Sequence, residues 1–327
     1  MFEVHGVVQH YDWGDTDVIP QLLGTSPDGR PWAELWLGTH PRGPATLADA
    51  SPLSTLTGEL GYLLKVLAAS QPLSLQTHPD AEGARHGYDR GVFGDPYPKP
   101  ELLMAITPVT ALCGVRPVER TLELLNDIGV NDLAALLHVN GPGAALEAIY
   151  RDQIDITAAI DACRNHASNE ARWVVALDEM YPGEASVVAT LLLNLVEVPP
   201  GAALRLDAGN LHAYLRGAGI ELMGASDNVV RGGLTSKEVD VDLLLATVDP
   251  TPLDDPVLAP AARFELPAAG VALERWGAGE GRTATMWEIA IGDNGVAIAL
   301  EPGEAAIATV DTWIVSACWP CVQSPLG

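Results

Sequence analysis

Lysine is scarce in this chain, because only three of its 18 basic residues are lysines: Lys65, Lys99 and Lys237. Arginine therefore carries the routine positive charge of the surface. A lysine that is retained in such a composition is more often needed as a compact, mobile ammonium group. Chance is the competing explanation, and the neighbours of each lysine have to decide between the two.

Positive charge as a whole is also scarce, since the formal net charge is -25 and the pI is near 4.4. Such a surface repels nucleic acid and anionic lipid, so we expect neither as a partner. It also repels phosphorylated metabolites. A ligand of that kind would need a pocket that is locally basic.

The chain lacks long apolar runs and an obvious disulfide framework. Its longest apolar run, 187–196, is interrupted by Asn194 and is too short to span a bilayer. The first residues show neither the basic nor the apolar region of a signal peptide. We therefore expect a cytoplasmic protein with four cysteines that are not organised as disulfides: Cys113, Cys163, Cys318 and Cys321. The CxxC spacing of the last two is a weak metal or redox signal, because no second pair accompanies it.

Apolar residues and turn formers are plentiful. The 327 residues are 48% hydrophobic and include 25 prolines and 32 glycines. This length and composition predict two or three structural units with a large core. The many turn residues favour a mainly β architecture with some helices added.

The stretch 72–80 alternates strictly between apolar and polar residues. Ser74, Gln76 and His78 share one face of the predicted strand, and Leu73, Leu75 and Thr77 share the other. A hydroxyl, a carboxamide and an imidazole on one short strand can hold a metal or a sugar. An ordinary half-exposed strand is the alternative for this stretch taken alone.

Other strand ends carry polar residues of the same kind. Asp12 follows one predicted strand, and the strand pattern at 34–39 ends at His40. In an extended Lys99-Pro100-Glu101, the lysine and the glutamate share a face. Each of these residues could instead be a solvated strand end.

Residues 116–193 switch to helical spacing, with a predicted break at 140–143. We expect a helical unit there that contributes no ligand to a site. Period-two patterns return at 194–240, where His212 and Tyr214 share a face. The turns around this strand resemble those of a cupin jelly-roll hairpin. The Gly-rich segment 226–237, which carries Arg231 and Lys237, is typical of a loop that faces an anion.

Taken together, these stretches resemble the type I phosphomannose isomerases, which belong to the cupin superfamily. The resemblance covers most of residues 1–250 and is carried by motifs in this order: Tyr-Asp-Trp-Gly (11–14), Ala-Glu-Leu-Trp-Leu-Gly-Thr-His-Pro (33–41), Leu-Leu-Lys-Val-Leu (63–67), Leu-Ser-Leu-Gln-Thr-His-Pro-Asp (73–80), Lys-Pro-Glu (99–101), Ala-Gly-Asn-Leu-His-Ala-Tyr-Leu (208–215) and Ser-Asp-Asn-Val-Val-Arg-Gly-Gly-Leu-Thr (226–235). All three lysines fall inside these motifs or just after them.

The resemblance implies one zinc ion per chain. Its ligands would be Gln76, His78, Glu101 and His212, and two imidazoles with two oxygens, one of them charged, suit zinc. It also implies that Arg231 is catalytic. Pocket or sugar-binding positions are implied for a further set: Ser74, Lys99, Lys237, Tyr214, Asp12 and His40.

The implied reaction is the reversible isomerisation of mannose 6-phosphate and fructose 6-phosphate through a cis-enediol, a step of mannose metabolism. A metal and a fixed guanidinium can stabilise the enediolate. Lys99 and Glu221 both remain open as the acid/base. The partner would be a small sugar phosphate, and we favour a monomer. A non-catalytic, metal-containing sugar-binding cupin is the main alternative, and a cupin iron oxygenase is a second, although Gln76 fills a position that such enzymes leave open.

The implied fold is a mainly β, cupin-type jelly roll with an α-helical insertion and a reduced C-terminal β domain. We expect residues 1–115 and 194–260 to form the catalytic domain, 116–193 the helical insertion and 261–327 the C-terminal domain. The sequence departs from the family in two respects. Thr77 stands where alanine is frequent, and the resemblance fades beyond about residue 260, with no clear continuation after Val310.

Overall fold

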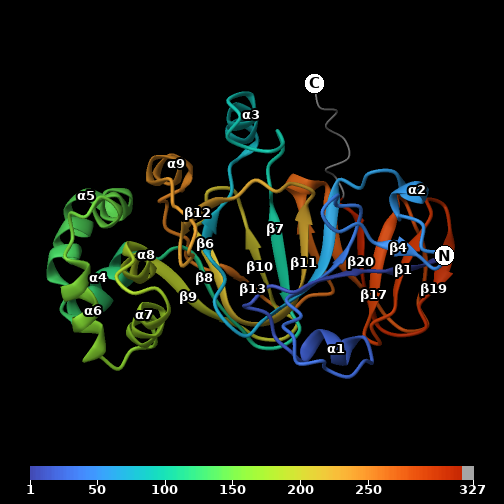
Figure 1. Ribbon diagram of the computed structural model, residues 1–327, viewed down its shortest axis with the longest axis horizontal. Helices are drawn as coiled ribbons and strands as arrows, with labels where there is room; N and C mark the ends of the chain where they lie inside the picture. The colour runs from blue at the N-terminus through green and yellow to red at the C-terminus, as the bar shows by residue number, and fades with distance from the viewer. Residues whose placement is uncertain (319–327) are drawn as a thin grey trace.

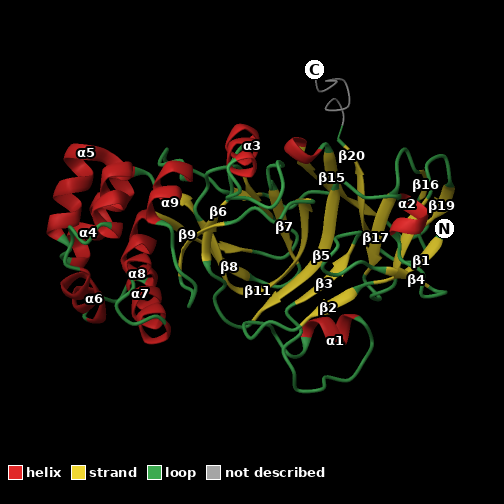
Figure 2. Ribbon diagram, turned by 45° about the horizontal axis from the view of Figure 1, so that its top comes forward, coloured by secondary structure: helices red, strands yellow, loops and turns green. Residues whose placement is uncertain are grey.

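The computed structural model describes residues 1–318. Helices gather at one end of the molecule, a large curved sheet forms the middle, and a second sheet forms the other end (Figures 1 and 2). Cys321 of the CxxC spacing lies outside the described residues. Among the residues that are described, no helix is long and apolar enough to cross a membrane.

The larger sheet has eleven strands and is antiparallel throughout. Its main path runs β13-β10-β7-β11-β5-β3-β2, and β11 also pairs with β6 and β8 of a second layer. The strands are β2 (Val7–Gln9), β3 (Glu34–Leu37), β5 (Tyr62–Ala69), β6 (Leu75–Thr77), β7 (Glu101–Ala105), β8 (Val109–Val115), β9 (Leu193–Val198), β10 (Ala203–Leu206), β11 (His212–Gly224), β12 (Val230–Gly233) and β13 (Val257–Leu258).

Strand β11 joins the two layers because it bends in its middle. Its register shifts between Tyr214 and Arg216 where it leaves β8, and Gly217 follows with φ of 111°. A Cβ atom at Gly217 would come within 2.4 Å of the carbonyl oxygen of Pro108, so only glycine fits this close approach. The first half of β11 therefore lies in one layer and the second half in the other, which produces the expected cupin-type jelly roll.

Alternation along the buried strands decides which residues face the interior of the jelly roll. All eight residues of β5 are buried, and residues 62, 64, 66 and 68 pack in the core shared with the C-terminal sheet. Leu63, Lys65 and Leu67 point the other way and line a cavity. Glu34 on β3 and Glu221 on β11 also line the cavity, and residues next to them (Leu35, Ile220 and Leu222) belong to that same core.

The helical unit covers the outer face of the layer that contains β6, β8 and β12, and its core is continuous with that layer. Gly141, with φ of 79°, kinks the longest helix at the predicted break. The helices are α4 (Val118–Ile128), α5 (Asn131–Tyr150), α6 (Ile156–Arg164), α7 (Asn169–Met180) and α8 (Ala185–Ala189), followed by the 3-10 turn η1 (Thr190–Leu192). Outside this unit lie α1 (Val18–Leu22), α2 (Ser54–Thr57), α3 (Ala81–Asp89), α9 (Val241–Thr247) and η2 (Pro267–Ala269).

The second sheet combines both ends of the chain, in the order β14-β15-β20-β17-β18-β1-β4. Strand β20 (Thr312–Ala317) pairs with two neighbours in its interior, so a regular strand follows Val310 where the sequence pattern was weak. The N-terminal segment thus contributes to both sheets. The remaining strands are β1 (Phe2–His5), β4 (Thr46–Leu47), β14 (Arg263–Leu266), β15 (Val271–Trp276), β17 (Glu288–Gly292) and β18 (Ala297–Leu300), with β16 (Gly281–Thr283) and β19 (Ala305–Ile307) as a separate pair.

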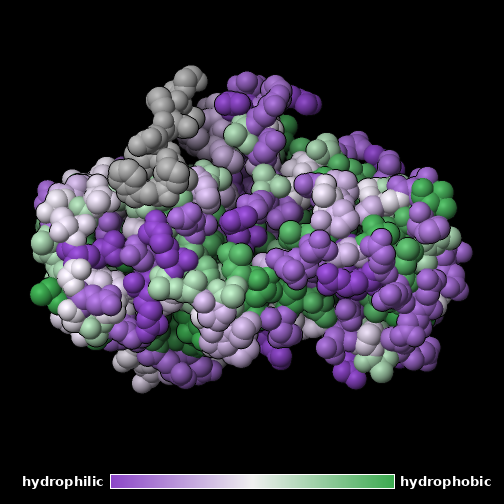
Figure 3. Space-filling view, turned by 180° about the vertical axis from the view of Figure 1, so that it is seen from behind, coloured by the Kyte–Doolittle hydropathy of each residue, from purple (hydrophilic) through white to green (hydrophobic). Residues whose placement is uncertain are grey.

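One face of the molecule is largely hydrophilic (Figure 3). Figure 3 shows a face on which hydrophilic residues are spread widely, with smaller hydrophobic patches between them. A patchwork of this kind is ordinary for a folded chain. The polar groups that call for a chemical explanation are the buried ones inside the jelly roll.

Candidate active site

A cavity of about 820 Å³ opens inside the jelly roll. Ten of the twelve site residues expected from the sequence line it: Asp12, His40, Ser74, Gln76, Lys99, Glu101, Tyr214, Glu221, Arg231 and Lys237. The other two, His78 and His212, are buried beside Glu101. The fold therefore gathers residues that lie more than 200 positions apart in the sequence.

Strand register sets one row of these residues side by side. Gln76 on β6 lies opposite His212 on β11 and, on its other side, opposite Arg231 on β12. Side chains of directly paired residues stand on the same face of a sheet. Arg231 reaches Ser74 from this position, with 3.2 Å between Nη1 and the Ser74 hydroxyl.

His78, Glu101 and His212 form a cluster in which one ligand atom from each lies within 4.8 Å of the others. The two Nε2 atoms lie 3.3 Å and 3.4 Å from Oε2 of Glu101. Nδ1 of His78 donates to the carbonyl oxygen of Asn228, and Nδ1 of His212 donates to that of Asn210. A carbonyl oxygen only accepts, so both protons sit on Nδ1 and both Nε2 lone pairs face the carboxylate.

This arrangement fits a metal cation. Nε2 of His78 and Oε2 of Glu101 are buried and have no hydrogen-bond partner among the described residues, although such groups are normally satisfied. Burial lowers the pKa of His78 to about 4, so a proton does not fill the gap near neutrality. The Gln76 amide lies 3.5 Å from Nε2 of His212, and a half-turn of the amide places its oxygen there. Two imidazoles and a carboxylate, with an amide oxygen beside them, suit zinc.

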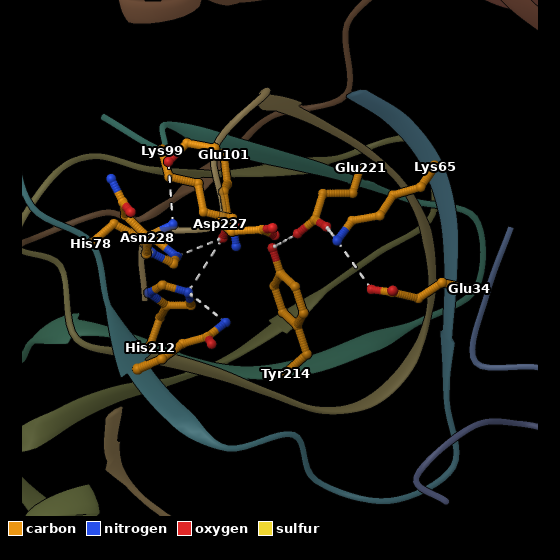
Figure 4. A network of polar contacts seen from close by, with 12 residues as sticks. Glu34, Lys65, His78, Lys99, Glu101, His212, Tyr214, Glu221, Asp227 and Asn228 are labelled. Carbon is orange, nitrogen blue, oxygen red and sulfur yellow. Dashed lines mark hydrogen bonds and ion pairs between the residues drawn. The ribbon is translucent and has the colours of Figure 1, made fainter. Parts of the chain in front are cut away.

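Lys99 holds the other oxygen of the same carboxylate, at 2.8 Å from Oε1 of Glu101 (Figure 4). Burial is the largest influence and would raise the pKa of Glu101, but Lys99 and the two neighbouring histidines together hold that pKa well below its usual range. Glu101 is thereby kept as a carboxylate, the form in which it binds a metal. Lys99 itself is almost fully buried.

A second buried network begins at Tyr214, two residues beyond His212. The Tyr214 hydroxyl donates to Glu221 at 2.8 Å, and the Lys65 ammonium lies 2.5 Å from Glu221 and 3.0 Å from Glu34. Figure 4 shows these side chains as one connected row across the cavity. Burial raises the pKa of Glu221, and burial with the nearby Glu221 charge raises that of Tyr214.

Sequence reasoning missed Lys65 and Glu34 as site residues. The available signal was a lysine in the middle of a strand whose other residues are apolar, since a charge at a fully buried position needs partners. It also missed Asp227, whose carboxylate lies 3.2 Å from Nε2 of His40 and pairs with Arg42. Burial would raise the pKa of Asp227, but the hydrogen bond from His40 and the charge of Arg42 lower it overall.

The helical unit reaches the site as well. Tyr181, directly after α7, lines the cavity; our prediction that this segment supplies no ligand stays a prediction. Helical spacing identifies the core-facing side of such a unit but does not tell where the residue after the last turn will point.

The cavity is electrically balanced in a strongly acidic protein. Five cationic side chains line it (Arg42, Lys65, Lys99, Arg231 and Lys237), and so do five acidic ones (Asp12, Glu34, Glu101, Glu221 and Asp227). A divalent metal would make the site locally positive. With a metal bound, the cavity would be the locally basic pocket that a phosphorylated ligand needs in such an acidic protein.

Comparison with known proteins agrees with this geometry. Residues 1–118 match the family model of the phosphomannose isomerase type I catalytic domain. Mannose-6-phosphate isomerase of Bos taurus is 31% identical over 82% of this chain and 78% of its own length, and that of Salmonella typhimurium is 29% identical over 95% of each. The crystal structure of the Salmonella typhimurium enzyme bound to fructose 6-phosphate and zinc has a TM-score of 0.82 at 26% identity, covering 97% of this chain and 99% of its own.

The fold, the buried donor cluster and these similarities lead to one conclusion: the chain belongs to the type I phosphomannose isomerase family.

Proposed function

We propose that this cavity interconverts D-mannose 6-phosphate and D-fructose 6-phosphate through a cis-enediol intermediate, with His78, Glu101, His212 and Gln76 holding one zinc ion. The chain is a zinc-dependent aldose–ketose isomerase of its family. The observation that carries the residue assignment is the group of inward-facing donor atoms in which two are buried without a hydrogen-bond partner.

Zinc, when bound, supplies a Lewis acid that stabilises negative charge developing on the substrate oxygens. The chain's own residues prepare its position in two ways. The carbonyl oxygens of Asn228 and Asn210 fix the tautomers of the two histidines, and Lys99 keeps Glu101 ionised. Outer partners of this kind orient the ligands and raise the affinity for the metal.

The phosphate and the enediolate need different cations. Lys237 and Ser74 are suited to the phosphate, because both line the cavity and offer it an ammonium group and a hydroxyl donor. Arg231 is held beside Ser74 and opposite Gln76, next to the proposed metal ligands. An arginine guanidinium is a permanent cation, so the proposed role of Arg231 is a fixed positive charge near the enediolate.

The proton moved between carbons 1 and 2 needs a carrier, and Glu221 and Lys99 are the candidates. We favour Glu221. Its pKa is raised by burial, which brings it nearer the working pH of a general base. Lys99 is tied to Glu101 at 2.8 Å, so giving up its proton would leave the carboxylate without its cation. Tyr214 and Lys65 orient Glu221 from two sides.

The test is a coupled isomerase assay on purified protein whose zinc content has been measured in the same sample. We expect turnover in both directions and its loss when a chelator removes the metal. Protein with full zinc that binds the sugar phosphate but does not isomerise it would favour the sugar-binding alternative.

We also propose an oligomeric state, a cellular compartment and domain boundaries for this chain. We propose that the chain acts as a monomer and works in the cytoplasm. Cys113 and Cys163 are free thiols, which is the usual state of cysteine in that compartment. We also keep the division into a catalytic domain (1–115 and 194–260), a helical insertion (116–193) and a C-terminal domain (261–327). Strands β1 and β4 would then be N-terminal segments that pair within the C-terminal sheet.

A further inference from the structure

Leu234 adopts a backbone conformation that leucine rarely takes. Its φ is 52°, in the left-handed region, and its side chain is buried. Such a conformation costs free energy and persists only where surrounding contacts impose it. Leu234 lies between Arg231 and Lys237, and the residues that follow it up to Lys237 line the cavity.

The contacts that impose this conformation come from the helical unit. The Leu234 N–H lies 3.0 Å from Oε2 of Glu184 and 3.2 Å from the Ser186 hydroxyl, which itself donates to Glu184 at 2.9 Å. The Tyr150 hydroxyl donates to the carbonyl oxygen of Gly232 at 2.5 Å. Three side chains from the region of α5 and α8 thus bind the backbone of two residues at the end of β12.

The fit between these parts is close. Gly233 has φ of 128°, and a Cβ atom there would lie 2.1 Å from Cβ of Ser186. Only glycine lets the backbone pass α8 at this distance. The chain turns directly afterwards, where the Lys237 N–H donates to the Thr235 hydroxyl at 3.2 Å. The position of Lys237 therefore depends on where Leu234 is held.

We infer that Glu184, with Ser186, is a latch in the helical unit that positions the segment 235–237 to bind the phosphate of the substrate. Glu184 is a positioning residue, because it acts through the backbone of Leu234 and does not line the cavity. This inference rests on the proposed function for the identity of the anion. It gives the helical unit a role in substrate binding beyond covering the sheet.

The first test is steady-state kinetics of Glu184→Ala. The loss of a hydrogen bond to a charged acceptor should raise KM for mannose 6-phosphate about tenfold, while kcat changes less than about twofold because a phosphate contact acts on ground and transition state alike. Glu184→Gln keeps an oxygen acceptor and should restore most of the affinity. Ser186→Ala, a milder change, should raise KM about threefold.

The matched control is Glu170→Ala, which removes an acidic side chain from the same helical unit. Glu170 pairs with Arg116 at 3.2 Å, at the start of α4 rather than at the loop. Its KM should stay at the wild-type value. An equal rise in KM in this control would mean that general loosening of the helices explains the effect, and the latch would be rejected.

A double-mutant cycle with Lys237→Ala separates positioning from an independent effect. If Glu184 acts through Lys237, the double variant should have about the KM of Lys237→Ala alone. If the two increases in KM multiply, Glu184 does not position Lys237 and the inference is wrong.

Limited trypsin digestion provides a readout that needs no catalysis. The segment around Lys237 is already exposed, so its cleavage depends on how firmly the backbone is held. Releasing Leu234 should loosen this segment and speed cleavage after Lys237 about tenfold in Glu184→Ala, but not in Glu184→Gln. The fragment that ends at Lys237 is identified by its mass. Unchanged cleavage together with unchanged KM would overturn the latch. If the wild type has no isomerase activity but Glu184→Ala is still cleaved faster than the wild type, only the proposed function is overturned.

Discussion

Lys65 and Glu221 lie directly opposite each other on β5 and β11 and form an ion pair of 2.5 Å inside the jelly roll. Both side chains are almost fully buried. Burial would lower the pKa of Lys65, but Glu221 and Glu34 raise it overall, so the ammonium keeps its charge. One buried cation thus serves two carboxylates, and the acid that we favour as the proton carrier is held in place by it.

The buried lysine should be important for stability. Lys65→Met leaves Glu221 and Glu34 buried without their cation, and we expect a loss of about 3–5 kcal/mol in the free energy of unfolding. Urea denaturation measures it. Lys237→Met is the matched control, since that lysine is exposed, and it should change stability by less than about 0.5 kcal/mol. Equal losses in both variants would contradict the buried network.

Removing the central carboxylate should remove the metal. Glu101→Gln keeps the size of the side chain but loses its charge. Mutating a residue that only hydrogen-bonds a metal ligand typically lowers metal affinity about 10–100-fold. Because Glu101 is a proposed ligand itself, we expect zinc affinity to fall by more than that. Metal analysis after dialysis against a weak chelator checks this, with the exposed Glu265→Gln as control. Full zinc content in Glu101→Gln would show that the ligand assignment is wrong.

Arg231 and Lys237 should differ in their kinetic effects. Arg231→Ala should lose about 10²–10³ in kcat, as removal of one preorganised donor typically does, while it keeps its zinc and its Tm. Lys237→Ala should mainly raise KM. Steady-state kinetics with metal content on the same samples measures both, and Arg216→Ala on the exposed side of β11 is the control. An Arg231→Ala enzyme with near wild-type kcat would refute the assigned role.

The pairing of Asp227 with His40 and Arg42 predicts a pH-dependent contribution to stability. Because the pKa of Asp227 is lowered in the folded chain, its contribution is fully present above the unfolded pKa of about 3.9 and is lost as pH falls through the folded pKa. The stability difference between wild type and Asp227→Asn should therefore be present at pH 6 and shrink below about pH 4. Urea denaturation at several pH values measures it, with the exposed Asp89→Asn as control. A difference that grows as the pH falls would contradict the pairing.

Much of the site could be predicted from the sequence because strands alternate strictly. The period of two placed Ser74, Gln76 and His78 on one face, and it placed His212 with Tyr214, whatever the rest of the fold does. The family motifs then supplied Glu101 and Arg231, and the structure brings all of these residues into one cavity or, for the two histidines, directly beside it. Their individual roles stay predictions until the variants are measured.

Contacts between distant segments could not be predicted in this way, since a local pattern does not contain the register between strands. Only the folded chain sets Lys65 opposite Glu221 and joins β1 to β18 across nearly the whole sequence. The same holds for Tyr181, which reaches the cavity from the helical unit.

The sequence by itself determined the chemical character of each strand face and thereby the donor atoms available to a metal. The tertiary structure alone decided which of them meet, because convergence depends on the bend of β11 at Gly217 and on how β6, β7 and β11 pair. It also decided that Leu234 takes a left-handed conformation. Glu184, 50 positions earlier in the chain, accepts the hydrogen bond of the Leu234 N–H. This contact from a distant residue offsets the conformational free energy that the backbone of Leu234 costs.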